Sequence, residues 1–171
     1  RHAQHYSQAC PANTTRTRWP SVAQKRAVRE LDNLRSAQAW AAARALAEAP
    51  QLAVVVGQVL ALVGQVAEAL AVIDGFESRD AALTVAALVC RGLAELDRGR
   101  PDAAIATLTA AVACADASGD PALQALPRGK LAFAMWRLGR GGLRPIVEEA
   151  LARLPAAVDP LVRADVAFVL G

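Results

Sequence analysis

The chain has few of the residues with which most enzymes do their chemistry. It contains two histidines, one methionine and three cysteines among 171 residues, and only 4% of its residues are aromatic. Both histidines, His2 and His5, stand at the start of the chain near Cys10, but a further ligand of fixed geometry is lacking for a metal site. We therefore expect no metal, no cofactor and no catalytic site in these residues.

The remaining titratable and nucleophilic groups do not converge either. Glu148 and Glu149 are adjacent, so on a helix they point about 100° apart and cannot act as one acid–base pair. We expect them to be solvated or paired with Arg144 or Arg153. Cys90 and Cys114 lie in apolar stretches that contain no histidine to activate them.

The cysteines are also too few and too scattered for a disulfide framework. Cys10, Cys90 and Cys114 are odd in number and show no CxxC spacing, which argues against disulfides and against a zinc ribbon. No basic segment followed by an apolar run opens the chain, so a signal peptide is not visible. Both features favour a reducing compartment, and we predict a cytoplasmic protein.

One stretch, from Leu52 to Ile73, is apolar enough to suggest a membrane span. However, Gln58, Gln65 and Glu68 recur inside it, and Gly64 divides it into two halves of helical-hairpin length. We therefore predict two short helices there and no membrane association.

Signals for strands are almost absent, because the valines are mixed with alanine and leucine and no Asn-Gly or Asp-Gly turn joins alternating segments. The pattern predicts an all-α protein. Its helices are expected at 21–46, 51–62, 65–74, 79–97, 101–116, 121–138, 144–154 and 160 to the end. Five prolines lie at or near these predicted helix starts, where a missing N–H costs little: Pro50, Pro101, Pro121, Pro145 and Pro160.

Small residues recur along the chain at similar spacing. Gly64, Gly99 and Gly139 are separated by 35 and 40 residues, and seven residues before them stand Gly57, Gly92 and Ala132. Ala69 and Ala104 stand five residues after Gly64 and Gly99. The small residues before and after each of these glycines allow two antiparallel helices to approach closely. Gly64, Gly99 and Gly139 themselves suit the turn between the two helices.

This spacing resembles the tetratricopeptide repeat, whose period is near 34 residues. The resemblance implies a right-handed superhelix of antiparallel helix pairs, a tetratricopeptide-like α-solenoid, over residues 47–171 with a truncated last repeat. The third repeat departs from the pattern, because Arg144 stands where alanine is expected. If the alignment is shifted by one residue, Leu143 and Ala150 point inward instead. Arg91 and Glu95 also fall on inward positions of the second repeat.

A second resemblance lies in residues 1–46, which we interpret as a linker and a long helix at the junction with an upstream domain. The segments RHAQHY (1–6) and RELDNLRSAQAWA (29–41) look like the start of the helical-repeat region in large bacterial signal-transduction ATPases, including LuxR-type transcriptional regulators common in actinobacteria. The residues that carry this likeness are Glu30, Asp32, Asn33, Leu34, Arg35, Ala37, Trp40 and Ala41. No phosphate-binding loop is found, since Gly129-Lys130 is followed by Leu131 inside a predicted helix.

In tetratricopeptide arrays the first helix of each pair lines a concave groove, and this resemblance assigns a partner-binding surface. The corresponding positions here are Gln51, Val54, Gln58, Ala86, Val89, Leu93, Leu126, Phe133, Trp136 and Arg137. Trp136 and Arg137 are of the types in which binding energy concentrates. The alternative is that Phe133 and Trp136 are ordinary core residues, as we expect Trp40 to be.

The charge is uneven, since residues 1–44 carry eight basic and two acidic residues, a balance of +6 in a chain of net charge +3. On one helix face Lys25 and Arg29 would form a phosphate-contacting stripe if DNA were the partner. No reading helix accompanies that stripe, so we expect a solvated or interdomain face.

We therefore predict a regulatory helical-repeat module of a larger bacterial transcriptional regulator. It would bind a protein partner or an adjacent domain of its parent chain, with a small-molecule effector as a further candidate. Two alternatives stay open: a stand-alone tetratricopeptide-type adaptor, and a nucleic-acid-binding helical domain.

Overall fold

The computed structural model describes residues 2–10, 12, 21–154 and 160–168, and within these residues every regular element is an α-helix. The polar loop at 11–20 lies outside the described residues, apart from Ala12. The helices are α1 (His2–Ala9), α2 (Ser21–Arg29), α3 (Leu31–Ala42), α4 (Ala49–Leu62), α5 (Val66–Asp74), α6 (Ala81–Asp97), α7 (Pro101–Ala117), α8 (Pro121–Arg137), α9 (Leu143–Arg153) and α10 (Pro160–Ala167).

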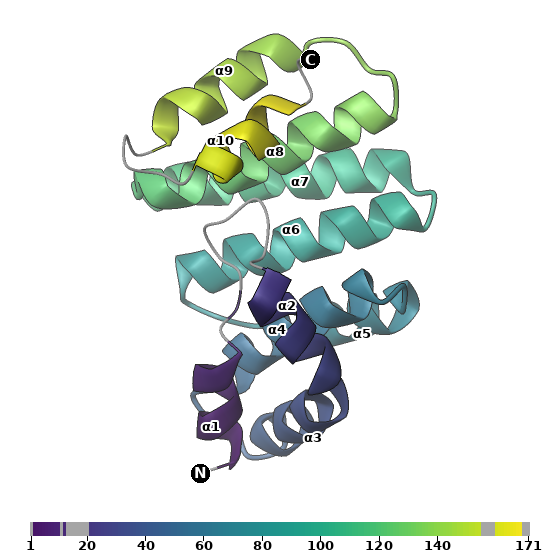
Figure 1. Ribbon diagram of the computed structural model, residues 1–171, viewed down its shortest axis with the longest axis vertical. Helices are drawn as coiled ribbons and strands as arrows, with labels where there is room; N and C mark the ends of the chain where they lie inside the picture. Colours follow the sequence, from purple (N-terminus) through teal and green to yellow (C-terminus); the bar gives the residue numbers. More distant parts are fainter. Residues whose placement is uncertain (1, 11, 13–20, 155–159, 169–171) are drawn as a thin grey trace.

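From α3 to α9 the helices are stacked in chain order along the long axis of the molecule, with α1 and α2 against α3 and α4 at one end and α10 against α8 and α9 at the other (Figure 1). From α3 to α10, each helix packs against its neighbour in the chain, and α4 with α6, α6 with α8, and α8 with α10 are also in contact. The short helices α1 and α2 both pack on α3 and α4. The fold is therefore built from contacts that are close in sequence.

The helices predicted between residues 51 and 154 are confirmed as α4 to α9, and each of their ends lies within two residues of its expected position. Pro101, Pro121 and Pro160 are the first residues of α7, α8 and α10, and Pro50 is the second residue of α4. Gly64, Gly99 and Gly139 have φ values of 81°, 72° and 63° in the turn that joins each pair. A residue with a Cβ is disfavoured in that conformation, which is why glycine recurs there.

The small residues before the turns allow the paired helices to touch. A Cβ added at Gly92 would lie 2.6 Å from Leu108 Cγ and 3.3 Å from the Ala104 carbonyl oxygen, and one added at Gly57 would lie 2.8 Å from Ile73. Ala69, Ala104 and Ala132 are completely buried. The spacing of small residues thus marks the close contacts between helices.

The third pair keeps this contact with a different set of residues. Ala150 and Val147 of α9 are completely buried, Leu143 is half-buried, and Arg144 is exposed, as the shifted alignment predicts. Glu95 of α6 is buried, as its inward position predicts, and accepts hydrogen bonds from Thr107 Oγ1 and Arg91 Nε.

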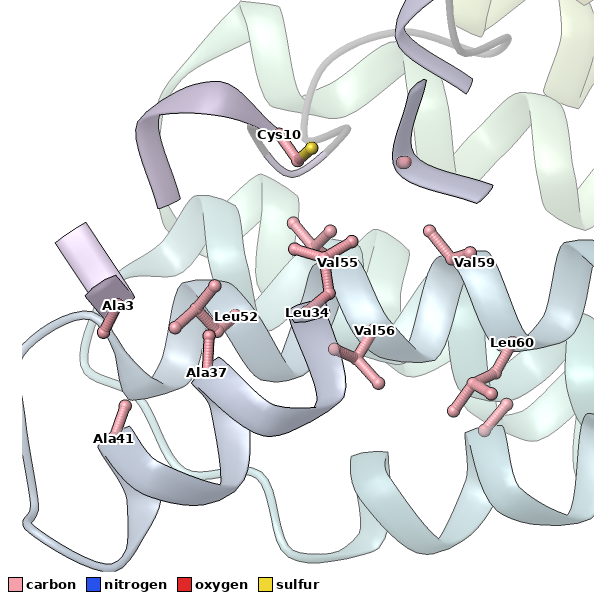
Figure 2. Packing of buried hydrophobic residues seen from close by; sticks show 12 residues of the cluster. Ala3, Cys10, Leu34, Ala37, Ala41, Leu52, Val55, Val56, Val59 and Leu60 are labelled. Carbon is pink, nitrogen blue, oxygen red and sulfur yellow. The ribbon is translucent and has the colours of Figure 1, made fainter. Parts of the chain in front are cut away.

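The apolar core runs through the stack as successive clusters. At the N-terminal end, α3 and α4 face each other, and Figure 2 shows Leu34 beside Val55 and Val56, and Ala37 beside Leu52. Further clusters join α6, α7 and α8, and then α8, α9 and α10. Because the side chains are mostly alanine, leucine and valine, the helices pack closely.

The N-terminal segment differs from its prediction. A single helix from residue 21 to about 46 is predicted, but the chain forms two helices that are separated at Glu30, which has φ −95° and ψ 9°. The second of these ends at Ala42, and the following turn contains Ala45 with a φ of 49°. Leu46 then packs into the N-terminal core cluster.

The apolar stretch between Leu52 and Ile73 forms α4 and α5, with a turn at Gly64. In the part of the chain that the structure describes, none of the helices has the length and apolar character that crossing a membrane requires.

Candidate interaction surface

The residues assigned to a groove from the repeat pattern all lie on α4, α6 and α8, but they differ in exposure. Val54, Ala86, Val89 and Leu126 are buried, so they hold helices together and offer no surface. Gln51, Gln58, Leu93 and Phe133 are half-buried, and Trp136 and Arg137 are exposed. The exposed part of the predicted groove is therefore concentrated at the end of α8.

The α4 part of the predicted groove is covered by the N-terminal helix. Gln51 Nε2 donates a hydrogen bond of 2.7 Å to the backbone carbonyl of Ser7, in the last turn of α1. That carbonyl has no partner within its own helix, because the last turn of a helix leaves its carbonyls free. Gln51 therefore attaches α1 to α4.

At the end of α8, three aromatic side chains gather on the surface. Trp136 is 46% exposed, and its ring lies edge-to-face against that of Phe168, with 5.5 Å between the ring centroids. On its other side, the ring of Phe133 is 6.0 Å away. Phe168 comes from the segment after α10 and is 62% exposed. Trp136 is thus not an ordinary core residue.

Charged groups lie beside these rings. The Arg137 guanidinium lies 5.9 Å from the centroid of the Phe133 ring and donates from Nη1 to Asp97 Oδ1 at 2.7 Å. In the next turn, Arg140 Nη2 donates to Asp102 Oδ1 at 2.6 Å. Both ion pairs connect the end of α8 with the turn between α6 and α7, so the surface spans two helix pairs.

Two members of this surface, Phe168 and Asp97, are not expected from the sequence. Phe168 lies 32 residues from Trp136, and no repeat of small residues places α10 against α8. Asp97 ends α6 and gives no signal of its own, because its partner follows 40 residues later. Only the stacking of successive pairs brings these residues to Trp136 and Arg137.

Trp40 is a second exposed tryptophan, contrary to the prediction that it packs into the core. It lies on α3, is 40% exposed, and carries the Arg44 guanidinium 4.6 Å from its ring centroid. In the described residues it has no aromatic ring beside it. The two exposed tryptophans therefore differ in their neighbours: Trp136 lies beside two phenylalanine rings, and Trp40 lies beside an arginine.

The residues that resemble the junction motif have structural partners. Leu34, Ala37 and Ala41 are completely buried against α1 and α4. Glu30 accepts hydrogen bonds from Asn33 Nδ2 at 2.8 Å and from Tyr6 Oη at 3.2 Å. Asn33 lowers the pKa of the Glu30 carboxyl most, burial opposes this shift, and Tyr6, Arg26 and Arg29 lower the pKa further.

Arg35 is the charged centre of the same motif. Its Nη2 donates to Gln65 Oε1 and to Glu68 Oε2, both at 2.6 Å, and its Nη1 lies 3.4 Å from Asp32 Oδ1. These contacts link α3 with the start of α5. The motif therefore fixes the first helices on the stack.

A buried arginine that the sequence analysis did not single out joins α7, α8 and α9. Arg128 is 4% exposed, and its Nη2 donates to Asp116 Oδ2 at 2.8 Å and to Glu149 Oε1 at 3.2 Å. Burial opposes its charge, but the hydrogen bonds and the charges of both carboxylates outweigh burial and raise its pKa. Its Nε is buried and has no hydrogen-bond partner among the residues that the structure describes.

The groups considered for catalysis do not form a centre. Glu148 pairs with Arg144 and Glu149 with Arg153, as predicted. Burial raises the pKa of the Cys90 thiol to about 12 and also raises that of Cys10, which keeps both thiols protonated. In the described residues no group of three or more His, Cys, Asp or Glu side chains is placed to hold a metal, and the His5 ring packs edge-on against Tyr6.

The basic residues of the N-terminal segment divide into two groups. Arg35 has acidic partners and Arg44 stacks on Trp40, whereas Lys25, Arg26 and Arg29 are exposed on α2. Arg1, Arg16 and Arg18 lie outside the described residues.

Comparisons with family models, with curated proteins and with solved structures gave no match to this chain.

Proposed function

We propose that this chain is a tetratricopeptide-like α-solenoid, a right-handed superhelix of antiparallel helix pairs, that works as a protein-interaction module. The proposal is supported by the recurrence of a close-contact residue and a turn glycine in successive pairs. It is also supported by the contacts of α4 with α6 and α6 with α8, because the first helices of neighbouring pairs touch in such an array.

The observation that carries the proposal is the position of the aromatic residues. The chain has seven Phe, Trp and Tyr residues, and three of them, Phe133, Trp136 and Phe168, meet on the surface. The fully buried core consists mainly of alanine, leucine and valine, and Phe133, which is half-buried, packs at the edge of one core cluster. Exposed aromatic clusters flanked by arginine are typical of binding surfaces.

We further propose that the module acts within a larger bacterial transcriptional regulator in the cytoplasm. This part rests on the likeness of residues 29–41 to the junction motif of signal-transduction ATPases. Its partner would be another protein or an adjacent domain, and occupancy of the surface would be passed to a switch domain. A small-molecule effector is a further candidate for the same role.

Photo-crosslinking in cells tests the interaction role. Benzoylphenylalanine replaces Phe168, which is exposed beside Trp136, and in a matched variant it replaces Ala106, which is exposed on α7. We expect a protein crosslink from position 168 and none from position 106. Absence of any product from position 168, or equal products from both positions, would refute the proposal.

A further inference from the structure

We infer that the surface formed by Phe133, Trp136, Arg137 and Phe168 binds an acidic segment of another protein that carries an aromatic or proline ring next to a carboxylate. This inference rests on the proposed interaction role and adds the chemistry of the partner. It follows from the rings, from the free donors of Arg137 and from the charge around them.

The rings provide an apolar platform of limited size. Trp136 and Phe168 meet edge to face and are 46% and 62% exposed as residues, so both remain open to solvent. Aromatic rings favour edge-to-face or offset contacts with further rings, and extended proline-rich segments dock on aromatic-lined surfaces. A single ring of the partner would find apolar contact on these side chains.

Arg137 can bind a carboxylate without losing its present partner. Of its five N–H donors, one Nη1 group bonds to Asp97, which is the one hydrogen-bond partner of Arg137 within the described residues. Both side chains of this ion pair are nearly half exposed, so the pair contributes little stability by itself. The remaining donors suit the two oxygens of a carboxylate, which arginine binds in a bidentate manner.

The arginine side chains favour an acidic segment over a basic one. Arg137 and Arg140 are paired with Asp97 and Asp102, and Arg163 on α10 is a further exposed arginine, so these described side chains comprise three cations and two anions. The aromatic faces could instead attract a cation, but Arg137 already lies over the Phe133 ring. A second cation there would face an arginine at close range, whereas a carboxylate would be attracted to it.

Peptide selection tests the inference without a known partner. Random twelve-residue peptides displayed on phage are selected on the immobilised chain, and enriched peptides are synthesised for fluorescence anisotropy. We expect enriched peptides to carry Phe, Tyr, Trp or Pro adjacent to Asp or Glu. Binding should weaken at least about 30-fold in Trp136→Ala and about 10-fold in Arg137→Gln, where its salt dependence should also fall.

The chain offers a matched control in Trp40 on α3 and Arg44 in the turn that follows it, which repeat the two residue types without a second aromatic ring among the described residues. Trp40→Ala should leave peptide affinity unchanged. Phe168→Ala is a second variant in case Trp136→Ala does not fold, because Phe168 is the most exposed of the three rings. Circular dichroism of each variant reports whether the helices are intact.

The outcomes separate this inference from the proposed interaction role. Enrichment of basic peptides, no enrichment at all, or affinity unchanged in Trp136→Ala and Phe168→Ala would each overturn the inferred partner chemistry. The interaction role would still stand if position 168 crosslinks to a protein in cells. Dimers that form with increasing concentration and disappear in Phe168→Ala would make a second copy the occupant and would also overturn it.

Discussion

At the scale of single residues, Glu30 shows how one side chain organises the N-terminal segment. Its carboxylate accepts hydrogen bonds from Tyr6 on α1 and from Asn33 on α3, and it stands where α2 ends and α3 begins. A carboxylate that accepts hydrogen bonds in the folded state is favoured in its charged form. The pKa of Glu30 is accordingly held below its ordinary value.

This shift predicts a pH-dependent stability that belongs to Glu30. Because the folded-state pKa is lowered, the contribution is fully present above the ordinary glutamate pKa of about 4.3 and is lost as the pH falls from there through the lowered value. We expect Glu30→Gln to flatten the loss of melting temperature in that pH range. Glu77→Gln, on the exposed loop between α5 and α6, serves as the control and should retain the slope. Identical pH profiles for Glu30→Gln and the unaltered protein would contradict this assignment.

The close approach of α6 and α7 predicts a strong response to added volume. Ala104 is completely buried, and its carbonyl lies where a Cβ at Gly92 would touch it. Ala104→Leu should therefore overpack this pair and lower the free energy of unfolding by about 1–3 kcal/mol. Ala103→Leu places the same side chain on an exposed position of α7 and should change little. Urea unfolding of both variants measures the difference, and equal stabilities would show that the assigned contact is wrong.

At the scale of elements, the sequence predicts the helices from residue 49 onward well. Prolines at helix starts and glycines at turns are local signals, so the ends of α4 to α9 follow from neighbouring residues. The break at Glu30 has no such local signal, and a hydrogen bond that Glu30 accepts there comes from Tyr6, which lies 24 residues earlier. Tertiary contacts override the local preference for a continuous helix there.

The candidate surface was predictable only in part, for a similar reason. The repeat register places Trp136 and Arg137 on the first helix of a pair, and their residue types suggest binding. The register alone does not show that Val54 and Val89 are buried or that α1 covers Gln51. Phe168 joins the surface through the packing of α10, which no local pattern encodes.

The burial of Arg128 predicts that two ways of removing its ion pairs lower the free energy of unfolding by different amounts. Asp116→Asn with Glu149→Gln leaves a buried, unneutralised guanidinium, and we expect a cost of about 2–3 kcal/mol, near the low end for a broken buried pair because both acids are nearly half exposed. Arg128→Met removes the buried charge, and the two acids can be hydrated. It should cost clearly less than the double variant. Chemical denaturation gives both values, and a larger loss in Arg128→Met would contradict the role assigned to burial.

At the scale of the whole molecule, charge changes sign along the stack. Residues 1–44 have a balance of +6, residues 45–120 carry four basic and ten acidic residues, and residues 121–171 carry seven basic and four acidic residues. Because the helices are stacked in chain order, the acidic part lies between two basic ends (Figure 1). A nucleic-acid backbone that followed the long axis of the described stack would therefore pass an acidic middle section, which would repel its phosphates.

The basic N-terminal end allows a quantitative expectation for DNA. Among the described residues of this end, Arg35 is paired with acidic groups and Arg44 lies on Trp40, which leaves the exposed α2 residues Lys25, Arg26 and Arg29. If these three side chains contacted phosphates, the logarithm of the binding constant would fall with the logarithm of the salt concentration with a slope of about −3. The dissociation constant would lie in the ordinary non-specific range of about 10⁻⁴–10⁻⁶ M. We therefore expect fluorescence anisotropy with duplex DNA at physiological salt to show no submicromolar binding.

Replacement of Lys25, Arg26 and Arg29 by glutamine should abolish what weak binding there is, whereas replacement of Arg98 and Arg100, at the turn before α7, should not. Submicromolar association with a steeper slope would instead make the N-terminal segment a nucleic-acid interface, since more cations than α2 presents would then have to contact phosphates.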